Sequence, residues 1–385
     1  MRTLDEYGFS GMGVVNRSYF VGMEKGVGYR MYFTYYSQFG RNDSILSDTE
    51  AAIITLLFLI AVFGNSIILV EVIRKCPSKT TEYFIGNLAF SDNLFVLTAP
   101  FIAVTRITRT WDFGYFVCHG VMYVLFACGG VSIWTMAIIS IDRYLRIVKN
   151  RVRPFSPRAV KLVIAVTWFI CLLTFLPIAI FFQLRTFRFG HSNVTICTLV
   201  WPKERVRISA IFVPYVLMAG FIIPLILMCF NYFCIFRKFW KSRKAVRPSQ
   251  LRSISGRWAV QRRPGNTLNL VRTRKRQERD FRVVRMLLLL VGLFVVMWSP
   301  VFVCLTGVQL DGLSNHMTMH SEYIVAATSI AYMNCCINPV IYGLINRTLV
   351  AGMWKYLRCL SLRTQRGHNE SVNSISGGPA RNNDI

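Results

Sequence analysis

Asp92 lies in the middle of a long apolar stretch, within the residues NLAFSDNLF. A carboxylate is costly to bury in such surroundings, so Asp92 marks a candidate functional site. Polar residues stand at comparable places in other apolar stretches: Asn65, Ser132, Asn334 and Asn338. A carboxylate among neutral oxygen donors can bind a hard cation or water. The same groups would equally form a hydrogen-bonded cluster that only holds helices together, and their spacing favours neither interpretation.

A second charged group is the tripeptide Asp142-Arg143-Tyr144, near the end of the third apolar stretch. Asp280 precedes the sixth stretch and would reach Arg143 if those two helix ends meet. The alternative is an arginine whose charged end extends to the membrane surface beside an exposed aspartate. The tripeptide alone does not separate a polar lock between helix ends from ordinary surface charge.

Prolines interrupt two of the apolar stretches. Pro339 lies in the sequence NPVIY, which ends at Tyr342, and Pro300 follows two residues after Trp298. A proline inside a helix leaves a backbone carbonyl without its usual N–H partner, which permits a kink or a hinge. None of the stretches pairs a nucleophile with a base or gathers a set of metal ligands. The sequence therefore does not indicate an enzyme.

The overall composition predicts that these polar groups lie in a membrane. Hydrophobic residues make up 54% of the 385 residues and charged residues 16%, yet the net charge is +27. Soluble proteins carry about 25% charged residues. Seven stretches are apolar over the roughly 20 residues that a helix needs to cross a bilayer: 51–74, 82–106, 115–148, 160–182, 208–237, 283–309 and 322–345. We therefore expect an all-α membrane protein with a seven-transmembrane helix bundle over residues 48–347.

Basic residues set the expected orientation. They follow the first and third stretches and fill a long loop at about 238–281. Loops rich in lysine and arginine stay in the cytoplasm, so residues 1–47 form an extracellular segment and the C-terminus is cytoplasmic. Residues 348–360 alternate apolar and basic positions, which predicts a short amphipathic eighth helix, and 361–385 form a disordered tail. Extracellular glycosylation sequons begin at three positions: Asn16, Asn42 and Asn193.

Together these motifs resemble the class A (rhodopsin-like) G-protein-coupled receptors over residues 48 to about 360. The ordered set runs from Gly64-Asn65 through NLAFSD, IDRY and WSP to NPVIY. The resemblance favours an allosteric sodium ion at Asp92, Ser132, Asn334 and Asn338, with no other cofactor. It also implies an extracellular disulfide between Cys118 and Cys197 and palmitoylation of Cys359.

The same resemblance implies a switch and a set of partners. Arg143 would pair with Asp142 or Asp280 in the inactive state, and Arg143 with Tyr232 would help to receive a heterotrimeric G protein. Arrestin and receptor kinases are further expected partners, and nucleic acid is not. The expected location is the plasma membrane. A transporter or a channel is the alternative from another class, although the chain shows no internal repeat.

Two residues that this chain lacks first narrow the class of ligand. Leu125 stands where amine receptors of this family carry an aspartate, and Tyr332 stands where opsins carry the retinal lysine. A basic outer region remains above an aromatic interior, which suits an amphiphile with an anionic head. We expect Arg106 to bind the head, and the apolar contacts to come from four residues: Trp111, Phe126, Trp298 and Phe302. The alternative is that the arginines reach lipid headgroups and the aromatic side chains form core and interface.

A narrower resemblance supports the lipid interpretation. The sequences TRITRTW, ICTLVWP and DFRVVR look like those of receptors for long-chain (omega-3) free fatty acids. That resemblance implies carboxylate recognition by Arg106, a loop position for Trp111 and a pocket floor at Trp298. The expected function is a receptor for a long-chain fatty acid or similar anionic lipid. The alternative within the same family is a neuropeptide receptor.

Overall fold

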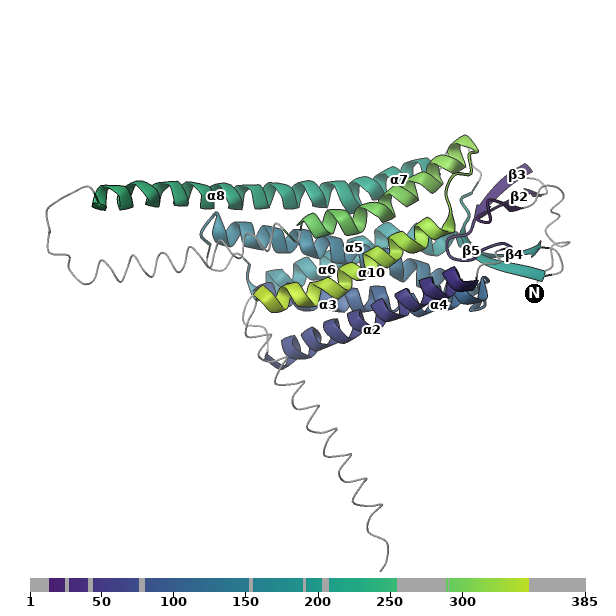
Figure 1. Cartoon of the computed structure of the whole chain (residues 1–385), viewed down its shortest axis with the longest axis horizontal. Coiled ribbons are helices and arrows are strands. Elements are labelled where there is room, and N and C mark those ends of the chain that lie inside the picture. Colours follow the sequence, from purple (N-terminus) through teal and green to yellow (C-terminus); the bar gives the residue numbers. More distant parts are fainter. Residues whose placement is uncertain are drawn as a thin grey trace, which may run out of the picture.

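The computed structural model describes residues 14–24, 28–40, 44–75, 80–151, 155–189, 192–202, 208–254, 289 and 291–345. Within these ranges, seven helices are long and apolar enough to cross a membrane. They correspond one to one to the predicted spans, with bounds that differ by several residues: Ser44–Arg74, Thr80–Thr108, Gly114–Ile147, Pro157–Phe181, Ile208–Lys241, Val291–Ser314 and Ser321–Ile341. The helices lie side by side as an elongated bundle (Figure 1). Several predicted features lie outside the described residues: the eighth helix at 348–360, the tail at 361–385, Cys359, Asp280 and Asn42.

The second and fifth spans are divided into shorter elements, and the fifth also continues well beyond the span. In chain order the helices are α2 (Ser44–Lys75), α3 (Thr80–Val96), α4 (Ala99–Thr108), α5 (Gly114–Ile147), α6 (Pro157–Phe181), α7 (Ile208–Leu217), the π-helix η1 (Met218–Ile222), α8 (Ile223–Ile254), the helix Val291–Ser314 and α10 (Ser321–Ile345). The second span bends between α3 and α4, where Pro100 lacks an N–H and the Thr98 hydroxyl donates to the carbonyl of Phe95 at 2.6 Å. Helical structure in α8 continues to Ile254, into the segment predicted as a basic loop.

Local chemistry fixes where the helices begin and end. α6 starts after Ser156, whose Oγ accepts a hydrogen bond from the backbone nitrogen of Ala159 at 3.2 Å, and Pro157 occupies the first turn. α4 ends at Arg109, which adopts a left-handed conformation with φ of 64° and donates its N–H to the carbonyl of Thr105. These caps satisfy backbone groups that the helix ends would otherwise leave unpaired.

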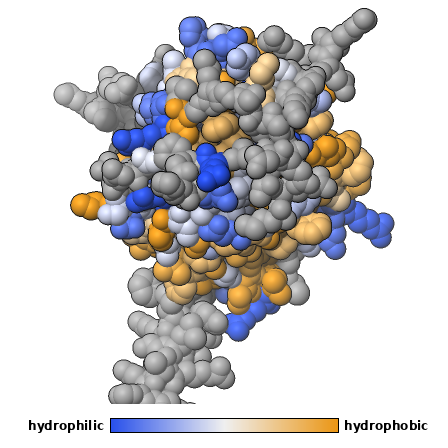
Figure 2. All heavy atoms as spheres, turned by 90° about the vertical axis from the view of Figure 1, so that its right-hand side faces the viewer, coloured by the Kyte–Doolittle hydropathy of each residue, from blue (hydrophilic) through white to orange (hydrophobic). Residues whose placement is uncertain are grey.

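α5 is the central helix of the bundle. It contacts α3, α6 and α8, while α10 packs against α2 and α3 on the other side. Large apolar side chains point outward from the bundle, including Leu56 and Phe63 of α2, Leu173 of α6 and Phe230 of α8. Such surfaces are expected where lipid replaces water. Figure 2 looks along the bundle from the right-hand side of Figure 1. Hydrophobic residues lie on the flanks, and many residues at the end facing the viewer are hydrophilic.

One end of the bundle carries two small antiparallel sheets, which the sequence did not predict. The first has the order β1 (Val14–Val15), β2 (Tyr19–Glu24) and β3 (Gly28–Phe33), and the second pairs β4 (Phe182–Phe189) with β5 (Ser192–Leu199). β3 also contacts β5, so the N-terminal sheet lies on the hairpin (Figure 1). We call this region the strand end. The predicted disulfide between Cys118 of α5 and Cys197 of β5 is present and joins the hairpin to the bundle, with Cα atoms 5.7 Å apart.

Candidate functional site

The polar cluster predicted around Asp92 is assembled in the centre of the bundle. The Asp92 carboxylate is fully buried and accepts hydrogen bonds from the Ser132 hydroxyl at 2.7 Å and the Asn338 amide at 2.8 Å. Asn334 is buried, and its amide nitrogen has no hydrogen-bond partner within the described part of the chain. α3, α5 and α10 therefore bring Asp92, Ser132 and Asn338 together, and Asn334 lies one helical turn before Asn338 on α10. Sodium binding at this cluster stays a prediction.

Asn65 has a different role from the other members of the predicted cluster. Its side-chain amide donates to the backbone carbonyl of Cys335 at 3.0 Å and to that of Ala61 at 2.9 Å. It thereby joins α2 to α10. Beside it, a Cβ added to Gly64 would lie 2.9 Å from Cγ of Pro339, so the missing side chain permits the close approach of these two helices.

Asp142, at the end of α5 away from the strands, accepts hydrogen bonds from α3 and from its own helix. Its carboxylate receives bonds from the hydroxyls of Thr80 at 3.2 Å and Thr81 at 2.8 Å, and from Nε of Arg146 at 2.9 Å. The arginine four residues along α5 thus pairs with this carboxylate. The predicted lock between Arg143 and Asp280 stays a prediction, since Asp280 lies outside the described residues.

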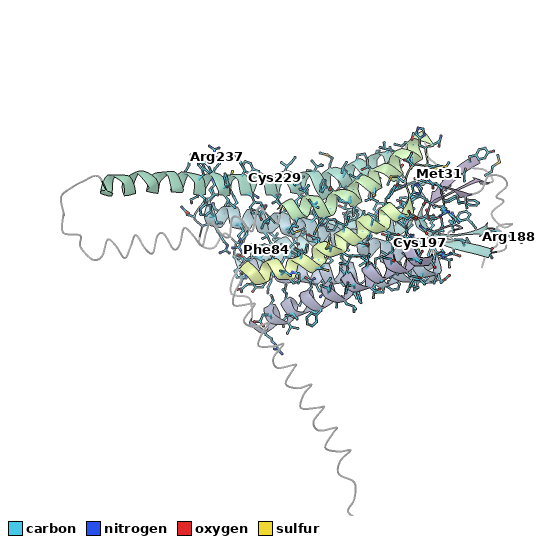
Figure 3. All side chains as sticks on the ribbon, in the orientation of Figure 1. Met31, Phe84, Arg188, Cys197, Cys229 and Arg237 are labelled. Atoms are coloured by element: carbon cyan, nitrogen blue, oxygen red, sulfur yellow. A yellow bond between two sulfur atoms is a disulfide. The ribbon has the colours of Figure 1, made fainter. Side chains whose placement is uncertain are left out.

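Further contacts join α5 and α8 at the same end. The Asn231 amide donates to the Ser140 hydroxyl at 2.9 Å, and the Lys238 ammonium group donates to the carbonyl of Ile147 at 2.6 Å. Tyr232 is buried between these contacts. Phe84 and Arg237, labelled in Figure 3, lie at this end, whereas Met31, Arg188 and Cys197 lie at the strand end. The side chain of Tyr342 is not among those described.

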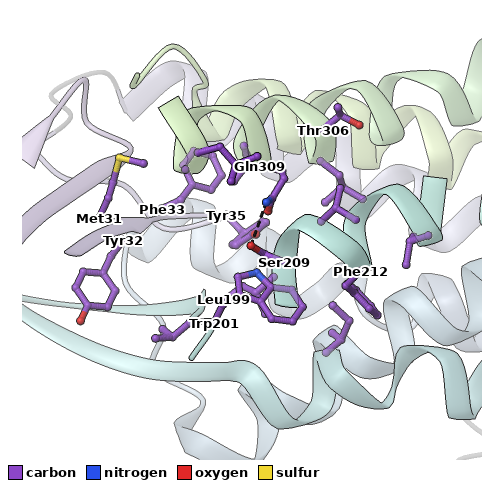
Figure 4. Close-up of a pocket in the computed structure, with 18 of the residues that line it drawn as sticks. Met31, Tyr32, Phe33, Tyr35, Leu199, Trp201, Ser209, Phe212, Thr306 and Gln309 are labelled. Atoms are coloured by element: carbon purple, nitrogen blue, oxygen red, sulfur yellow. Dashed lines mark hydrogen bonds between the residues drawn. The ribbon is translucent and has the colours of Figure 1, made fainter. Parts of the chain in front are cut away.

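The strand end holds a cavity of about 550 Å³, which we call the upper cavity. Its walls come from β3, the residues after β5, α7 and the helix Val291–Ser314 (Figure 4). Most of the lining is aromatic or aliphatic, with Trp201 and Phe212 facing the space, and Nε2 of Gln309 donates to Oγ of Ser209 at 3.0 Å between two helices. Among its described lining residues, Arg30 is the one charged side chain.

A second, smaller cavity of about 60 Å³ lies deeper in the bundle, and we call it the deep cavity. Trp298 lines it, packed against Phe95 with ring centroids 5.7 Å apart. Phe126 and Phe302 line both cavities. Three of the predicted ligand contacts therefore surround these spaces.

The other two predicted ligand contacts, Arg106 and Trp111, line neither of these cavities. Arg106 is 1% exposed, and its guanidinium group forms an ion pair with Glu50 at 2.7 Å. Trp111 is buried against the β4–β5 hairpin, where its backbone N–H donates to the carbonyl of Thr195 at 2.8 Å. N-terminal residues and the hairpin cover this end of α4, and ligand binding by Arg106 and Trp111 stays a prediction.

The N-terminal residues that cover the bundle had no predicted structural role. Tyr35 and Tyr36 follow β3 and line the deep cavity, together with Trp298. Burial raises the pKa of Tyr36 to about 12, so its phenol stays neutral at physiological pH. The five aromatic residues from Tyr29 to Tyr36, which include Tyr32, Phe33 and Tyr35, were the available sequence signal.

Two of the predicted glycosylation sites, Asn16 and Asn193, differ in how accessible their side chains are. The Asn16 amide nitrogen, which would carry the glycan, donates to the backbone carbonyls of Met317 and Met319. A glycan on Asn16 would break these contacts. Asn193 is exposed at the tip of the β4–β5 hairpin and is accessible for the same modification. Glycosylation remains a prediction.

The arrangement of these helices and motifs matches that of a known protein family. Residues 64–342 match the family described as 7 transmembrane receptor (rhodopsin family). The chain belongs to this family. Because the family and the relatives are receptors, the protein is not an enzyme, as predicted. The same finding sets aside the transporter or channel alternative.

Individual relatives of this receptor differ in their ligands. It is 27% identical to free fatty acid receptor 4 of Rattus norvegicus, over 92% of this chain and 93% of that protein. It is 29% identical to somatostatin receptor type 4 of Rattus norvegicus, over 84% of this chain and 76% of that protein. Somatostatin receptor type 2 of Sus scrofa is also 29% identical, over 77% and 75% of the two chains. The relatives therefore include both a free fatty acid receptor and somatostatin receptors, and they do not resolve the type of ligand.

Proposed function

We propose that this receptor binds a long-chain fatty acid or a similar anionic lipid at its strand end. The observation that carries the proposal is the chemistry of the upper cavity, whose described lining contains the cation Arg30, no acidic residue and many aromatic side chains. A cationic ligand would lack a counter-charge there, whereas an anionic head would meet a guanidinium group. An acyl chain matches the apolar remainder. The similarity to a free fatty acid receptor over nearly the whole chain supports the same class.

The proposed membrane orientation puts the strand end outside the cell. The disulfide and Asn193 then lie in the oxidising, glycosylating compartment. The basic loop near 238–281 lies in the cytoplasm, as the positive-inside rule requires. The N-terminus is extracellular, the C-terminus is cytoplasmic, and the receptor resides in the plasma membrane.

The proposed output is activation of a heterotrimeric G protein at the opposite end of the bundle. A ligand changes the balance of two receptor conformations only by binding one of them better. Trp298 on the deep cavity would report how far the acyl chain enters, and the hinge at Pro339 would accommodate the change. Arg143 and Tyr232 would contact the G protein, and arrestin and receptor kinases would act on the same end. Palmitoylation of Cys359 belongs to the same proposal.

A matched pair of lipids tests the ligand class. Cells that express the receptor are treated with oleic acid or with oleyl alcohol, which has the same chain without the carboxylate, and calcium and arrestin recruitment are recorded. We expect a response to the acid and a much weaker one to the alcohol. Because a hydrogen bond to a charged group contributes about 1.5–3 kcal/mol, Arg30→Gln should reduce the potency of the acid at least about tenfold. Arg188→Gln is the control, because Arg188 lies on β4 at the same strand end but outside the cavity lining.

The predicted role of Arg106 in binding the ligand head is tested in the same assay. In Arg106→Gln the predicted head-group contact is lost, while Glu50→Gln removes the carboxylate that now pairs with Arg106. If Arg106 binds the ligand, Arg106→Gln lowers potency and Glu50→Gln does not. Equal responses to acid and alcohol, or full potency in both arginine variants, would reject the anionic-lipid proposal.

A peptide receptor is the second candidate, favoured by the 29% identity to somatostatin receptor type 4. A panel of neuropeptides in the same cells distinguishes the two. A response to peptides with none to fatty acids would replace the lipid proposal with this one.

A further inference from the structure

Residues 34–40 follow strand β3, and two of them, Tyr35 and Tyr36, reach into the helix bundle and line the deep cavity. Tyr35 and Tyr36 are 6% and 4% exposed although they belong to no helix. The backbone carbonyl of Tyr36 accepts a hydrogen bond from the Arg106 guanidinium group at 2.8 Å, and its hydroxyl lies 3.5 Å from the Thr328 hydroxyl on α10. The segment is therefore bound by side chains of α4 and α10, as a separate peptide ligand would be.

Hydrogen bonds on either side hold this segment in place. The Tyr19 hydroxyl donates to the Asp311 carboxylate at 2.7 Å, at the end of the helix Val291–Ser314. The Ser18 hydroxyl accepts from the backbone nitrogen of Ser321 at 2.9 Å, at the start of α10. On the hairpin side, the Thr198 hydroxyl donates to the carbonyl of Phe33 at 2.7 Å. The N-terminal sheet thus connects the ends of two helices whose relative movement would alter the cavity.

Tyr35 stands between the two cavities. It lines both the upper cavity of about 550 Å³ and the deep cavity of about 60 Å³. The deep space, at about 60 Å³, is far smaller than the roughly 300–1,000 Å³ of pockets that bury a drug-sized ligand. A ligand that fills the upper cavity cannot place a chain or side chain beside Trp298 while Tyr35 and Tyr36 stay where they are.

We propose that residues 34–40 are an intramolecular ligand, an aromatic peptide that occupies the transmembrane site and must withdraw before an external molecule contacts Trp298. The inference does not depend on whether that molecule is a lipid or a peptide. A tethered segment acts at a high effective concentration. The apparent affinity for an external ligand is then reduced by the fraction of receptors whose segment has withdrawn.

Cys304 provides a direct measurement, because it is a free, buried cysteine that lines the deep cavity. The receptor in detergent is treated with N-ethylmaleimide, and the modification of Cys304 is followed by mass spectrometry. We expect slow labelling in the wild type and labelling at least about tenfold faster in Tyr35→Ala/Tyr36→Ala, where both rings are absent. Tyr29→Ala is the matched control, since Tyr29 lies on β3 shortly before these residues, lines the upper but not the deep cavity and is 62% exposed. The exposed Cys229 should react at the same rate in all variants.

A locked variant tests withdrawal without removing any aromatic side chain. Ser18→Cys/Ser321→Cys places two thiols where the Ser18 hydroxyl meets the backbone nitrogen of Ser321, which is close enough for a disulfide. The oxidised variant should label at Cys304 more slowly than the wild type, and reduction should restore the wild-type rate. Equal rates in the oxidised and reduced forms, or in the wild type and the double alanine variant, would overturn the proposal. A failure of the fatty acid assay would leave these rates unchanged, so the two proposals fail separately.

Discussion

The guanidinium group of Arg106 on α4 lies 2.7 Å from the carboxylate of Glu50 on α2. Arg106 is almost completely buried, and the side chain of Glu50 is 14% exposed. The pair joins two neighbouring helices beneath the N-terminal segment. Arg106 was predicted to bind the anionic head of a ligand, and in the structure its guanidinium group is paired with the Glu50 carboxylate.

Breaking this pair from one side should destabilise the receptor. Glu50→Gln leaves a buried guanidinium group without its counter-charge, which typically costs about 3–5 kcal/mol. Thermal unfolding of the purified receptor should therefore occur at a markedly lower temperature. In Arg106→Gln/Glu50→Gln neither charge is left unpaired, so the loss should be smaller than the sum of the two single losses. Asp48→Asn changes an exposed acid of the same helix and serves as the control. Strict additivity of the two single substitutions would show that the pair contributes nothing.

The second prediction concerns Asp311, which holds the N-terminal sheet. Its carboxylate accepts hydrogen bonds from the Tyr19 hydroxyl and from the backbone nitrogens of Thr318 and Met319. Because a bond to a charged acceptor contributes about 1.5–3 kcal/mol, Tyr19→Phe should lower the free energy of unfolding by about that amount. Asp311→Ala should cost more, since several donors then lose their partner.

The matched comparison for Tyr19 is Tyr29→Phe, which removes the same hydroxyl from a residue that is 62% exposed. Proteolysis of the N-terminal residues supplies a second measurement, and Tyr19→Phe should be cut faster than the control. Indistinguishable melting temperatures and cleavage rates for the two variants would contradict the proposed anchoring role.

The sequence predicted the helices well because membrane crossing imposes a simple physical requirement. Each span needs a long apolar run, and buried polar residues such as Asp92 and Asn338 then stand out. The boundaries were less accurate where a helix continues into water. The sixth span was expected to end at residue 309, whereas the helix continues to Ser314 and so includes Asp311.

The N-terminal sheet, and the position of Tyr35 and Tyr36 at the deep cavity, could not be predicted from hydropathy. Residues 14–40 contain no long apolar run, and their contacts with Asp311, Arg106 and Thr328 join positions far apart in the chain. Hydropathy carries no information about such pairings. Arg106 was therefore expected to face a ligand, although its nearest carboxylate belongs to Glu50.

The third prediction concerns sodium at Asp92. The carboxylate accepts hydrogen bonds from the Ser132 hydroxyl and the Asn338 amide nitrogen, and carboxylate and hydroxyl oxygens suit a hard cation. If sodium binds there, raising its concentration at constant ionic strength should change agonist affinity in the wild type. Asp92→Asn should abolish that change, because the amide carries no charge. Choline replaces sodium in the control solution, and a dependence that persists in Asp92→Asn would exclude this site.

The last prediction tests the packing of the central helix around the deep cavity. A Cβ added to Gly130 of α5 would lie 2.7 Å from Cε2 of Phe175 on α6, whereas one added to Gly120 of the same helix meets nothing within 4 Å. Gly130→Ala should therefore destabilise the receptor by about 1–3 kcal/mol through overpacking. Gly120→Ala should be neutral or slightly stabilising, since alanine is favoured over glycine in a helix by about 1 kcal/mol.

Phe175 also lines the deep cavity, so the same substitution should affect more than stability. A ring displaced by the new methyl group would move within the space below Tyr35, and the labelling rate of Cys304 should change in Gly130→Ala but not in Gly120→Ala. Thermal unfolding and maleimide labelling of the two variants measure both effects. Equal stability of the two variants would show that α5 and α6 separate easily at this contact, and an unchanged labelling rate would show that Phe175 does not limit access to Cys304.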